Sequence, residues 1–165
     1  MATAEATRRF AERAVAAGLP IHAFRLLGQT GLTVSALGFG TYRIDEQTAH
    51  QSAALLQAIG GGINLIDTST NYMDGSSERA IGAALRRLSG DEIVVVSKAG
   101  YVQGQALALA RSREAAGAPF PDMVKYADGC WHCIHPAFLA DQLTRSLRSE
   151  EHTSELQSRF GISYA

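Results

Sequence analysis

Three side chains that can take part in proton transfer follow two mostly apolar segments of this chain. Asp67 comes directly after the run 63–66, Tyr72 lies five residues later in a loop of Thr, Ser, Asn and Gly, and Lys98 comes two residues after the run 93–96. A lysine ammonium beside a phenol stabilises the phenolate, and a carboxylate beside the lysine offsets its positive charge. Together they would form a general acid with a tuning cation, which can protonate a carbonyl oxygen as it gains negative charge.

The elements that precede these residues are predicted to be a helix and a hairpin. Residues 2–18 have high helix propensity and end at Gly18 and Pro20, so we predict a helical N-terminal extension over residues 1–23. The apolar segments 24–27 and 32–34 flank the turn-like sequence GQTG and predict a β-hairpin. The run SALGFG then predicts a first buried strand that ends near Gly40.

Strands and amphipathic helices alternate in the next part of the chain. Asp45 is the predicted N-cap of one helix, a strand follows at 63–66, and Ser76 or Ser77 is the predicted cap of a second helix. Four apolar residues at 93–96 predict a strand covered on both faces. Residues 101–135 show no period and predict a long loop, after which Pro136 opens a third helix. The positions at helical spacing in the three helices are Ser52, Leu55, Leu56 and Ile59, then Ile81, Leu85 and Leu88, then Leu139, Leu143 and Leu147.

This order indicates an α/β fold with a parallel sheet, either an open doubly wound sheet or a closed barrel. Both architectures place chemistry at the carboxyl ends of the strands, and consecutive parallel strands are usually neighbours. Asp67 and Lys98 should therefore meet on one rim with Tyr72 above it, although each of them alone could also be solvated decoration of a strand end. No Gly-x-Gly-x-x-Gly follows the first strand and no P-loop occurs, so the open nucleotide-binding fold is the weaker architecture.

Composition and charge limit the class of partner. The chain has 165 residues, of which 46% are hydrophobic and 19% charged, as is ordinary for one globular domain. Its net charge of −1 gives no basic field for nucleic acid or for an anionic membrane, so we expect a small-molecule partner. No apolar stretch approaches the roughly 20 residues of a membrane helix and no secretory leader is evident, so we predict a cytoplasmic protein. Nothing in the sequence indicates an oligomeric state.

The segment CWHC at residues 130–133 offers a rival site. Cys130 and Cys133, with two neighbouring histidines, could serve redox chemistry or bind a metal ion, and this alternative stays open. A redox C-x-x-C normally opens a helix, however, and these residues are closely spaced for the four ligands of one zinc ion. We therefore expect no metal site. Instead, the predicted loop should fold over a pocket mouth, where Trp131 and Tyr126 would shape substrate choice.

Three long motifs resemble the N-terminal part of the aldo-keto reductase family. They are FRLLGQTGLTVSALGFGT (24–41), GINLIDTSTNYMDGSSERAIGAAL (62–85) and IVVVSKAG (93–100). The resemblance implies a (β/α)₈ TIM barrel whose floor is closed by the hairpin. Residues 24–147 would then form a partial, truncated barrel consisting of the hairpin and about three βα units. The resemblance also implies a nicotinamide cofactor, NADP(H) in preference to NAD(H), that delivers hydride to an aldehyde or ketone.

The resemblance also assigns roles to individual residues. Asp67, Tyr72 and Lys98 resemble three members of the family's catalytic tetrad, with Tyr72 as the acid, and Gly40, Thr41, Tyr42 and Asp67 are implied to bind the cofactor. The tetrad's histidine follows the family's fourth strand, and no residue of this chain matches it by motif. We therefore expect the chain as written to be inactive, with reversible carbonyl reduction belonging to the full-length parent. A non-catalytic binding or regulatory member of the family is the alternative.

The last segment is predicted not to belong to the fold. The sequence RSEEHTSELQS (148–158) has no helical or strand period and resembles the translation of a common sequencing adaptor. The sequence ISYA (162–165) resembles the adaptor's next constant segment. We therefore expect residues 148–165 to be an artefact and the natural sequence to stop in mid-fold at Leu147.

Overall fold

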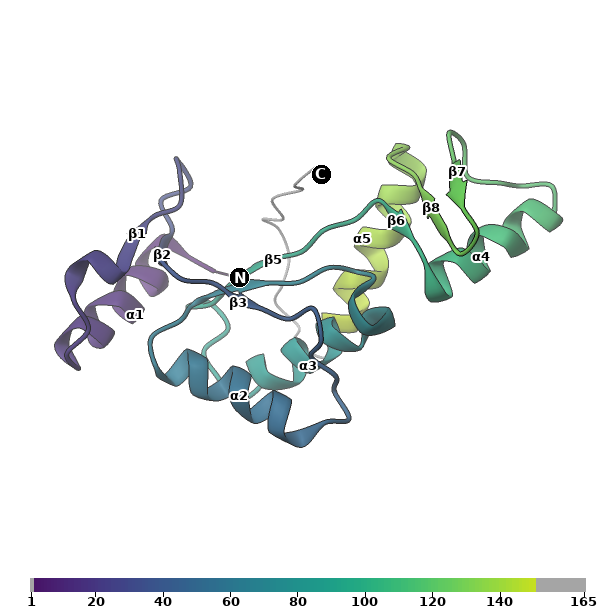
Figure 1. The fold of residues 1–165 in the computed structure, drawn as a ribbon. Helices are drawn as coiled ribbons and strands as arrows, with labels where there is room; N and C mark the ends of the chain where they lie inside the picture. Colours follow the sequence, from purple (N-terminus) through teal and green to yellow (C-terminus); the bar gives the residue numbers. More distant parts are fainter. Residues whose placement is uncertain (1, 151–165) are drawn as a thin grey trace.

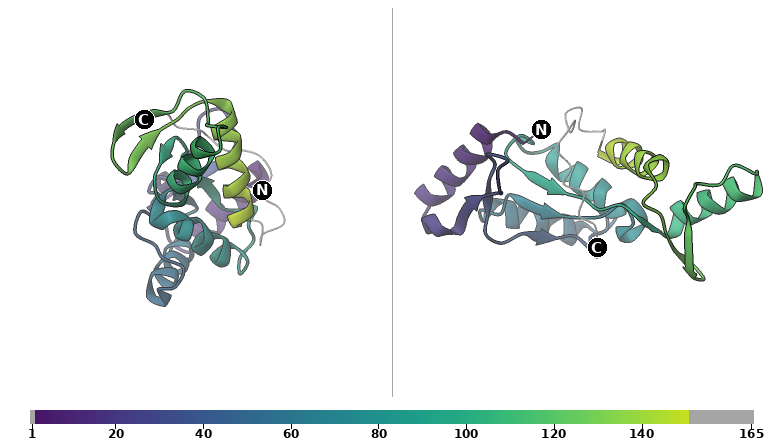
Figure 2. Two further views of the ribbon diagram at one scale, coloured as in Figure 1. Left: turned by 90° about the vertical axis from the view of Figure 1, so that its right-hand side faces the viewer. Right: turned by 90° about the horizontal axis from the view of Figure 1, so that it is seen from above.

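A computed structural model describes residues 2–150, which form three groups of elements along the chain. Figure 1 shows a helix and a hairpin at one end, a parallel sheet with two helices in the middle, and a small antiparallel sheet with a helix at the other end. Figure 2 shows the same order from above, in the elongated view.

The first group confirms the predicted helix and hairpin. Its elements are α1 (Ala4–Ala16), the 3₁₀ turn η1 (Ile21–Ala23), β1 (Phe24–Leu26) and β2 (Thr33–Ser35). The side-chain oxygen of Thr3 accepts a hydrogen bond from the Ala6 amide at 3.1 Å, which supplies the cap that lets α1 begin there. The helix packs against β2, and the Phe10 ring lies edge-on to Phe24 with centroids 6.3 Å apart. The predicted extension is therefore packed on the hairpin.

The middle group is a parallel sheet in the order β3-β4-β5, as the alternation of strands and helices predicts. Its elements are β3 (Phe39–Gly40), α2 (Ala49–Gly60), β4 (Leu65–Asp67), α3 (Ser76–Leu85) and β5 (Val94–Val96). Gly40 pairs with Asp67, and Asp67 pairs with Val96, so the three strands end at one level. That level is the rim on which the candidate site lies.

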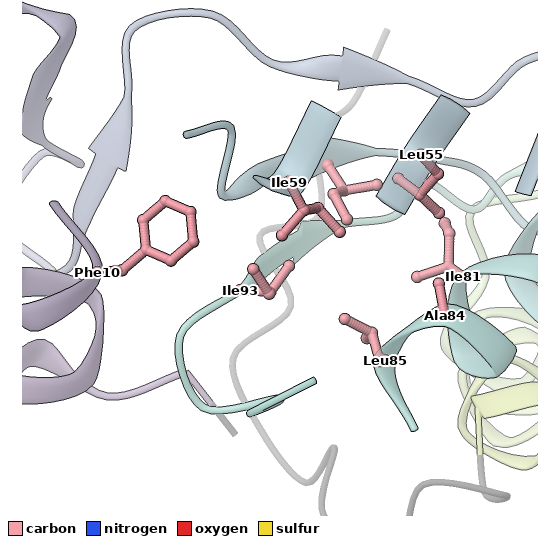
Figure 3. Close-up of a cluster of buried hydrophobic side chains, with 8 residues drawn as sticks. Phe10, Leu55, Ile59, Ile81, Ala84, Leu85 and Ile93 are labelled. Atoms are coloured by element: carbon pink, nitrogen blue, oxygen red, sulfur yellow. The ribbon is translucent and has the colours of Figure 1, made fainter. Parts of the chain in front are cut away.

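One hydrophobic cluster joins this sheet to its two helices. Figure 3 shows how Leu55 and Ile59 of α2 and Ile81 of α3 point toward the strands, with Ile93 beneath them. The ring of Phe10 reaches the same cluster from α1, so the N-terminal helix contributes to the core. Burial of apolar area of this kind is the main force that holds the sheet and helices together.

Asn64 links the hairpin to the parallel sheet from a fully buried position. Its Oδ1 accepts a hydrogen bond from the Ser35 amide at 2.7 Å. Its Nδ2 donates to the carbonyl oxygens of Thr33 at 3.0 Å and Glu92 at 3.2 Å. One amide side chain thus satisfies backbone groups in β2 and in the segment before β5, where no regular ladder joins the two sheets.

The prediction of a long loop over residues 101–135 is wrong, because this segment folds into a small lobe. Its elements are β6 (Tyr101–Val102), α4 (Gly104–Ala115), β7 (Val124–Ala127) and β8 (Cys130–His132), with the antiparallel order β6-β8-β7. A second hydrophobic cluster holds the lobe together and includes Val102, Leu107, Trp131 and Phe138. Strands of two to four residues are too short to show a period, and α4 mixes Ala and Leu around its circumference, so no stripe marks it as a helix.

The predicted third helix is confirmed as α5 (Pro136–Glu150), which packs against α3. Its buried side chains are Phe138, Gln142 and Ser146, whereas Leu143 is 41% exposed. The leucine stripe that predicts the helix is therefore not its most buried face. Ser146 occupies an inward position because its hydroxyl has a partner there, the buried carboxyl of Glu78.

Both predicted helix caps are wrong. Thr48 holds the N-cap position of α2, and the side chain of Asp45 instead accepts hydrogen bonds from the Gln47 amide and the Ser76 hydroxyl. Gly75 holds the N-cap position of α3, while Ser77 donates to the carbonyl oxygens of Thr41 and Ile44 at 2.8 Å. These side chains therefore bond to residues outside their own helices: Ser76 and Asp45 bond to each other, and Ser77 bonds to the segment 41–44.

Helix α5 continues past Leu147, the predicted end of the natural sequence, to Glu150. The remainder of the predicted artefact, residues 151–165, lies outside the described residues. Among the helices of residues 2–150, none has the length and apolar character needed to cross a membrane. The cytoplasmic location stays a prediction.

Candidate active site

The two charged residues predicted for the site lie together on the rim of the parallel sheet. Asp67 is the last residue of β4, and Lys98 follows β5 by two residues. Lys98 Nζ donates to Asp67 Oδ1 at 2.6 Å and to the Thr68 carbonyl oxygen at 2.8 Å. The two side chains are 31% and 44% exposed, so solvent screens the ion pair and its main effect is to fix the ammonium rather than to stabilise the fold.

Tyr72 is placed beside this ammonium by a short turn. It is the first residue of the 3₁₀ turn η2 (Tyr72–Gly75), and its hydroxyl lies 3.3 Å from Lys98 Nζ. Lys98 Nζ also lies 5.0 Å from the centre of the Tyr72 ring. A cation in contact with a phenol oxygen stabilises the charge left when the phenol gives up its proton. The arrangement can therefore act as a proton donor to a polar group bound above the rim.

The residues predicted to bind the cofactor divide into two groups. Gly40 ends β3 with open space where a Cβ would lie, and Tyr42 is 64% exposed with its ring edge-on to Tyr72 at 5.1 Å. Thr41 is fully buried, and both its amide and its hydroxyl donate to the Asp67 carbonyl oxygen, at 3.0 and 2.9 Å. Gly40 and Tyr42 thus lie open on the rim, whereas Thr41 uses its hydroxyl to hold the backbone of Asp67.

Glu78 lies directly beneath the site, although no pattern in the sequence singles it out. Its carboxyl is almost wholly buried and accepts hydrogen bonds from the hydroxyl of Ser97, at 2.8 Å, and from that of Ser146 on α5. Burial raises the pKa of the Glu78 carboxyl, and the two serine hydrogen bonds oppose that rise. Since Ser97 is next to Lys98, Glu78 fixes the backbone from which the ammonium extends. A glutamate in the first turn of a helix ordinarily complements the helix dipole, so its spacing carried no signal.

The cysteines of the CWHC segment do not meet in this structure. Cys130 begins strand β8, and Cys133 follows its end, so about 10 Å of extended backbone separates their Cα atoms, beyond the reach of a disulfide. Cys133 is buried and donates to the Pro121 carbonyl oxygen at 3.3 Å, while Cys130 accepts from Gln103. The segment is a strand, not the loop that the sequence predicts. Within residues 2–150, no three metal-ligating side chains of His, Cys, Asp or Glu converge.

Trp131 is also placed differently from its prediction. It packs into the second cluster, under the cations of Arg111 and Lys125, and is 8% exposed. It therefore supports the lobe from within and does not line a pocket mouth. Tyr126 is 55% exposed on β7, and partial desolvation together with the neighbouring Cys130 raises the pKa of Tyr126 to about 12.

Comparison with known proteins places the chain in a defined group. Residues 36–149 match the model of the Aldo/keto reductase family. An aldo-keto reductase from Bacillus halodurans in its holo form is 25% identical and has a TM-score of 0.59, over 78% of this chain and 36% of that chain. A putative aldo-keto reductase from Pseudomonas aeruginosa is 32% identical and has a TM-score of 0.53, over 78% of this chain and 42% of that chain. None of the curated proteins matches.

A third solved structure shares the fold. The glycerol dehydrogenase from Gluconobacter oxydans is 20% identical and has a TM-score of 0.55, over 78% of this chain and 36% of that chain. The chain therefore spans less than half the length of each of these three structures. The predicted fold class, a partial α/β barrel, is confirmed.

Proposed function

Because this chain belongs to the aldo/keto reductase family, whose members are oxidoreductases, we propose that the Tyr72 site reduces an aldehyde or ketone to an alcohol. The contacts of Lys98 Nζ are the observation that most supports this proposal. Lys98 Nζ lies within 3.3 Å of the Tyr72 hydroxyl and 2.6 Å of Asp67 Oδ1, so an acid, a cation and a counter-ion share one rim. Since the chain spans less than half the length of the three structures compared above, the activity and substrate of the whole protein belong to this proposal.

In the proposed reaction, Tyr72 donates its hydroxyl proton to the carbonyl oxygen while that oxygen gains negative charge. Lys98 stabilises the phenolate that remains, because its ammonium contacts the phenol oxygen. Asp67 holds the ammonium in place and offsets its charge. In the reverse direction the same phenolate accepts the proton of the alcohol, so the three side chains serve a reversible reaction.

A nicotinamide cofactor, when bound, supplies the hydride that reaches the carbonyl carbon. The residues present fit its nicotinamide end, since Gly40 leaves open space at the end of β3 and Tyr42 exposes an aromatic ring beside Tyr72. Thr41 would act indirectly, by holding Asp67. NADP(H) in preference to NAD(H) follows from the family resemblance.

Two variants and a matched control test the proposal on the full-length parent protein. Tyr72→Phe and Lys98→Met should each lower turnover of an aldehyde by about 100- to 10,000-fold, the usual contribution of a general acid. Lys125→Met makes the same chemical change as Lys98→Met, but in the lobe, and should leave turnover nearly unchanged. The measurement is oxidation of NADPH followed by its absorbance.

The outcomes separate the reductase from the alternative. Turnover that survives Tyr72→Phe would refute the role given to Tyr72. Nicotinamide binding without turnover of any carbonyl would favour a non-catalytic binding or regulatory protein. The 165-residue chain itself is proposed to be inactive, and enzyme-like carbonyl reduction by the purified polypeptide would overturn that part.

A further inference from the structure

The turn that carries Tyr72 has an unfavourable backbone that its own residues do not explain. Met73 and Asp74, the two residues after Tyr72, have φ values of 48° and 54°, and Gly75 follows with φ of 84°. Left-handed backbone is disfavoured for residues that carry a Cβ. Contacts outside the turn must therefore hold it, and with it the position of the Tyr72 hydroxyl.

The N-terminus of α4 supplies the strongest of these contacts. The first amides of a helix lack partners within the helix, and Gln103, at the N-cap position of α4, makes no capping hydrogen bond with its side chain. Asp74 Oδ1 accepts from the Gln105 amide at 2.9 Å instead. A carboxylate is favourable at this end of a helix, since the helix dipole is positive there. Asp74 is therefore the cap of α4, supplied from a distant turn.

A second contact holds the other side of Tyr72. Asn71 Nδ2 donates to Gln103 Oε1 at 3.0 Å, while Asn71 Oδ1 accepts from the Ser69 hydroxyl at 2.6 Å. The same Ser69 hydroxyl lies 3.2 Å from the Lys98 carbonyl oxygen. Asn71, immediately before Tyr72, is thus hydrogen-bonded to Gln103, and Asp74, two residues after Tyr72, is hydrogen-bonded to Gln105. The contacts of Asn71 continue through Ser69 to the backbone of Lys98.

Close approach at this junction requires glycine at position 104. Gly104 has φ of 52°, and a Cβ built there would lie 2.2 Å from Asp74 Oδ1. Any larger residue would displace the carboxylate that caps α4. The junction can therefore be disturbed from the helix side without altering any residue of the Tyr72 turn.

We propose that Asp74 is a positioning residue for Tyr72, which clamps the turn to the N-terminus of α4 and so sets the phenol against Lys98. The significance of the clamp for catalysis rests on the proposed function, but the clamp itself does not. It can be measured on the 165-residue chain without cofactor or substrate, so its failure and the failure of the reductase assignment are distinguishable.

The test follows two local signals by NMR spectroscopy. One is hydrogen exchange of the Gln105 amide, which reports the cap, and the other is the nuclear Overhauser effect between the rings of Tyr42 and Tyr72. Asp74→Ala should speed Gln105 exchange by roughly tenfold or more, as expected when a hydrogen bond to a charged group is lost, and should weaken the ring contact. Gly104→Ala should do the same. Asp74→Asn keeps an acceptor oxygen and tolerates left-handed backbone, so it should retain the ring contact.

Asp122 supplies the matched control, because it also has a left-handed backbone, with φ of 54°, but lies in the turn before β7. Asp122→Ala should leave both signals unchanged. Unchanged signals in folded Asp74→Ala or in Gly104→Ala would overturn the proposal. If Asp74→Ala fails to fold, Gly104→Ala and Asp74→Asn decide. Loss of the ring contact in Gly104→Ala together with its retention in Asp74→Asn supports the clamp. Any other pattern refutes it.

Discussion

Replacing Asn64 by alanine should destabilise the fold by about 3 kcal/mol, because this one side chain satisfies three backbone groups. The amide of Ser35 is buried at its contact with Asn64 Oδ1, and a buried donor left unpaired costs about 2 kcal/mol. The carbonyl oxygens of Thr33 and Glu92 bond in partly buried positions, where water can replace the lost donor, so each adds about 0.5 kcal/mol.

Urea unfolding followed by circular dichroism measures this effect. With a slope of about 2 kcal/mol per molar urea, the midpoint should fall by about 1.5 M. Gln57→Ala, on the exposed face of α2, is the control and should change the free energy of unfolding by less than about 0.5 kcal/mol. A loss under about 1 kcal/mol for Asn64→Ala would refute the reasoning, since it would mean that the hairpin does not depend on these hydrogen bonds.

Three further predictions concern buried groups. Because burial raises the pKa of Glu78, its contribution to stability is present below the unfolded pKa of 4.5 and is lost as pH rises. E78Q should therefore gain stability relative to the wild type as the pH rises from acidic to neutral. A difference in urea unfolding that does not depend on pH would contradict this. Phe138→Ala should cost about 3 to 5 kcal/mol in the same assay, because the ring is fully buried in the second cluster, and a cost near zero would show that the lobe does not depend on it. Burial also raises the pKa of the Cys133 thiol, so iodoacetamide at neutral pH should modify Cys130 first, as read by mass spectrometry of the peptides; equal rates would be the contrary result.

Much of the fold could be predicted because its first two groups of elements are locally consistent. The hairpin has a turn sequence between two apolar segments, and the run at 93–96 is continuously apolar, as is typical of a strand in a parallel sheet, although Val95 and Val96 are only half-buried. The lobe at 101–135 could not be predicted, since its elements are stabilised by packing around Trp131 and Phe138, which lie far along the chain from β6 and α4. Helix caps failed for the same reason: Ser77 bonds to a neighbouring segment rather than to its own helix.

The candidate site was predictable in its exposed half only. Asp67 ends β4 and Lys98 lies two residues after β5, and the parallel topology then brings them to one rim. Glu78, which supports Lys98 from below through Ser97, gave no signal, because a buried glutamate has the same appearance in sequence as a solvated one. Polar residues in the interior are specified by partners that only the folded chain brings together.

The separate apolar cluster of the lobe makes residues 101–138 an exchangeable unit. The side chains that stabilise it come from within those residues, apart from partly buried contacts such as Leu139, and hydrogen bonds from Asn71 and Asp74 fasten α4 to the rim. Natural variation or a deliberate graft can therefore replace the surface that the lobe presents while the strands, and the side chains of Asp67, Tyr72 and Lys98 beside them, stay as they are. A transplanted lobe needs glycine at its junction with the rim and an acceptor opposite it, as Gly104 and Asp74 provide here.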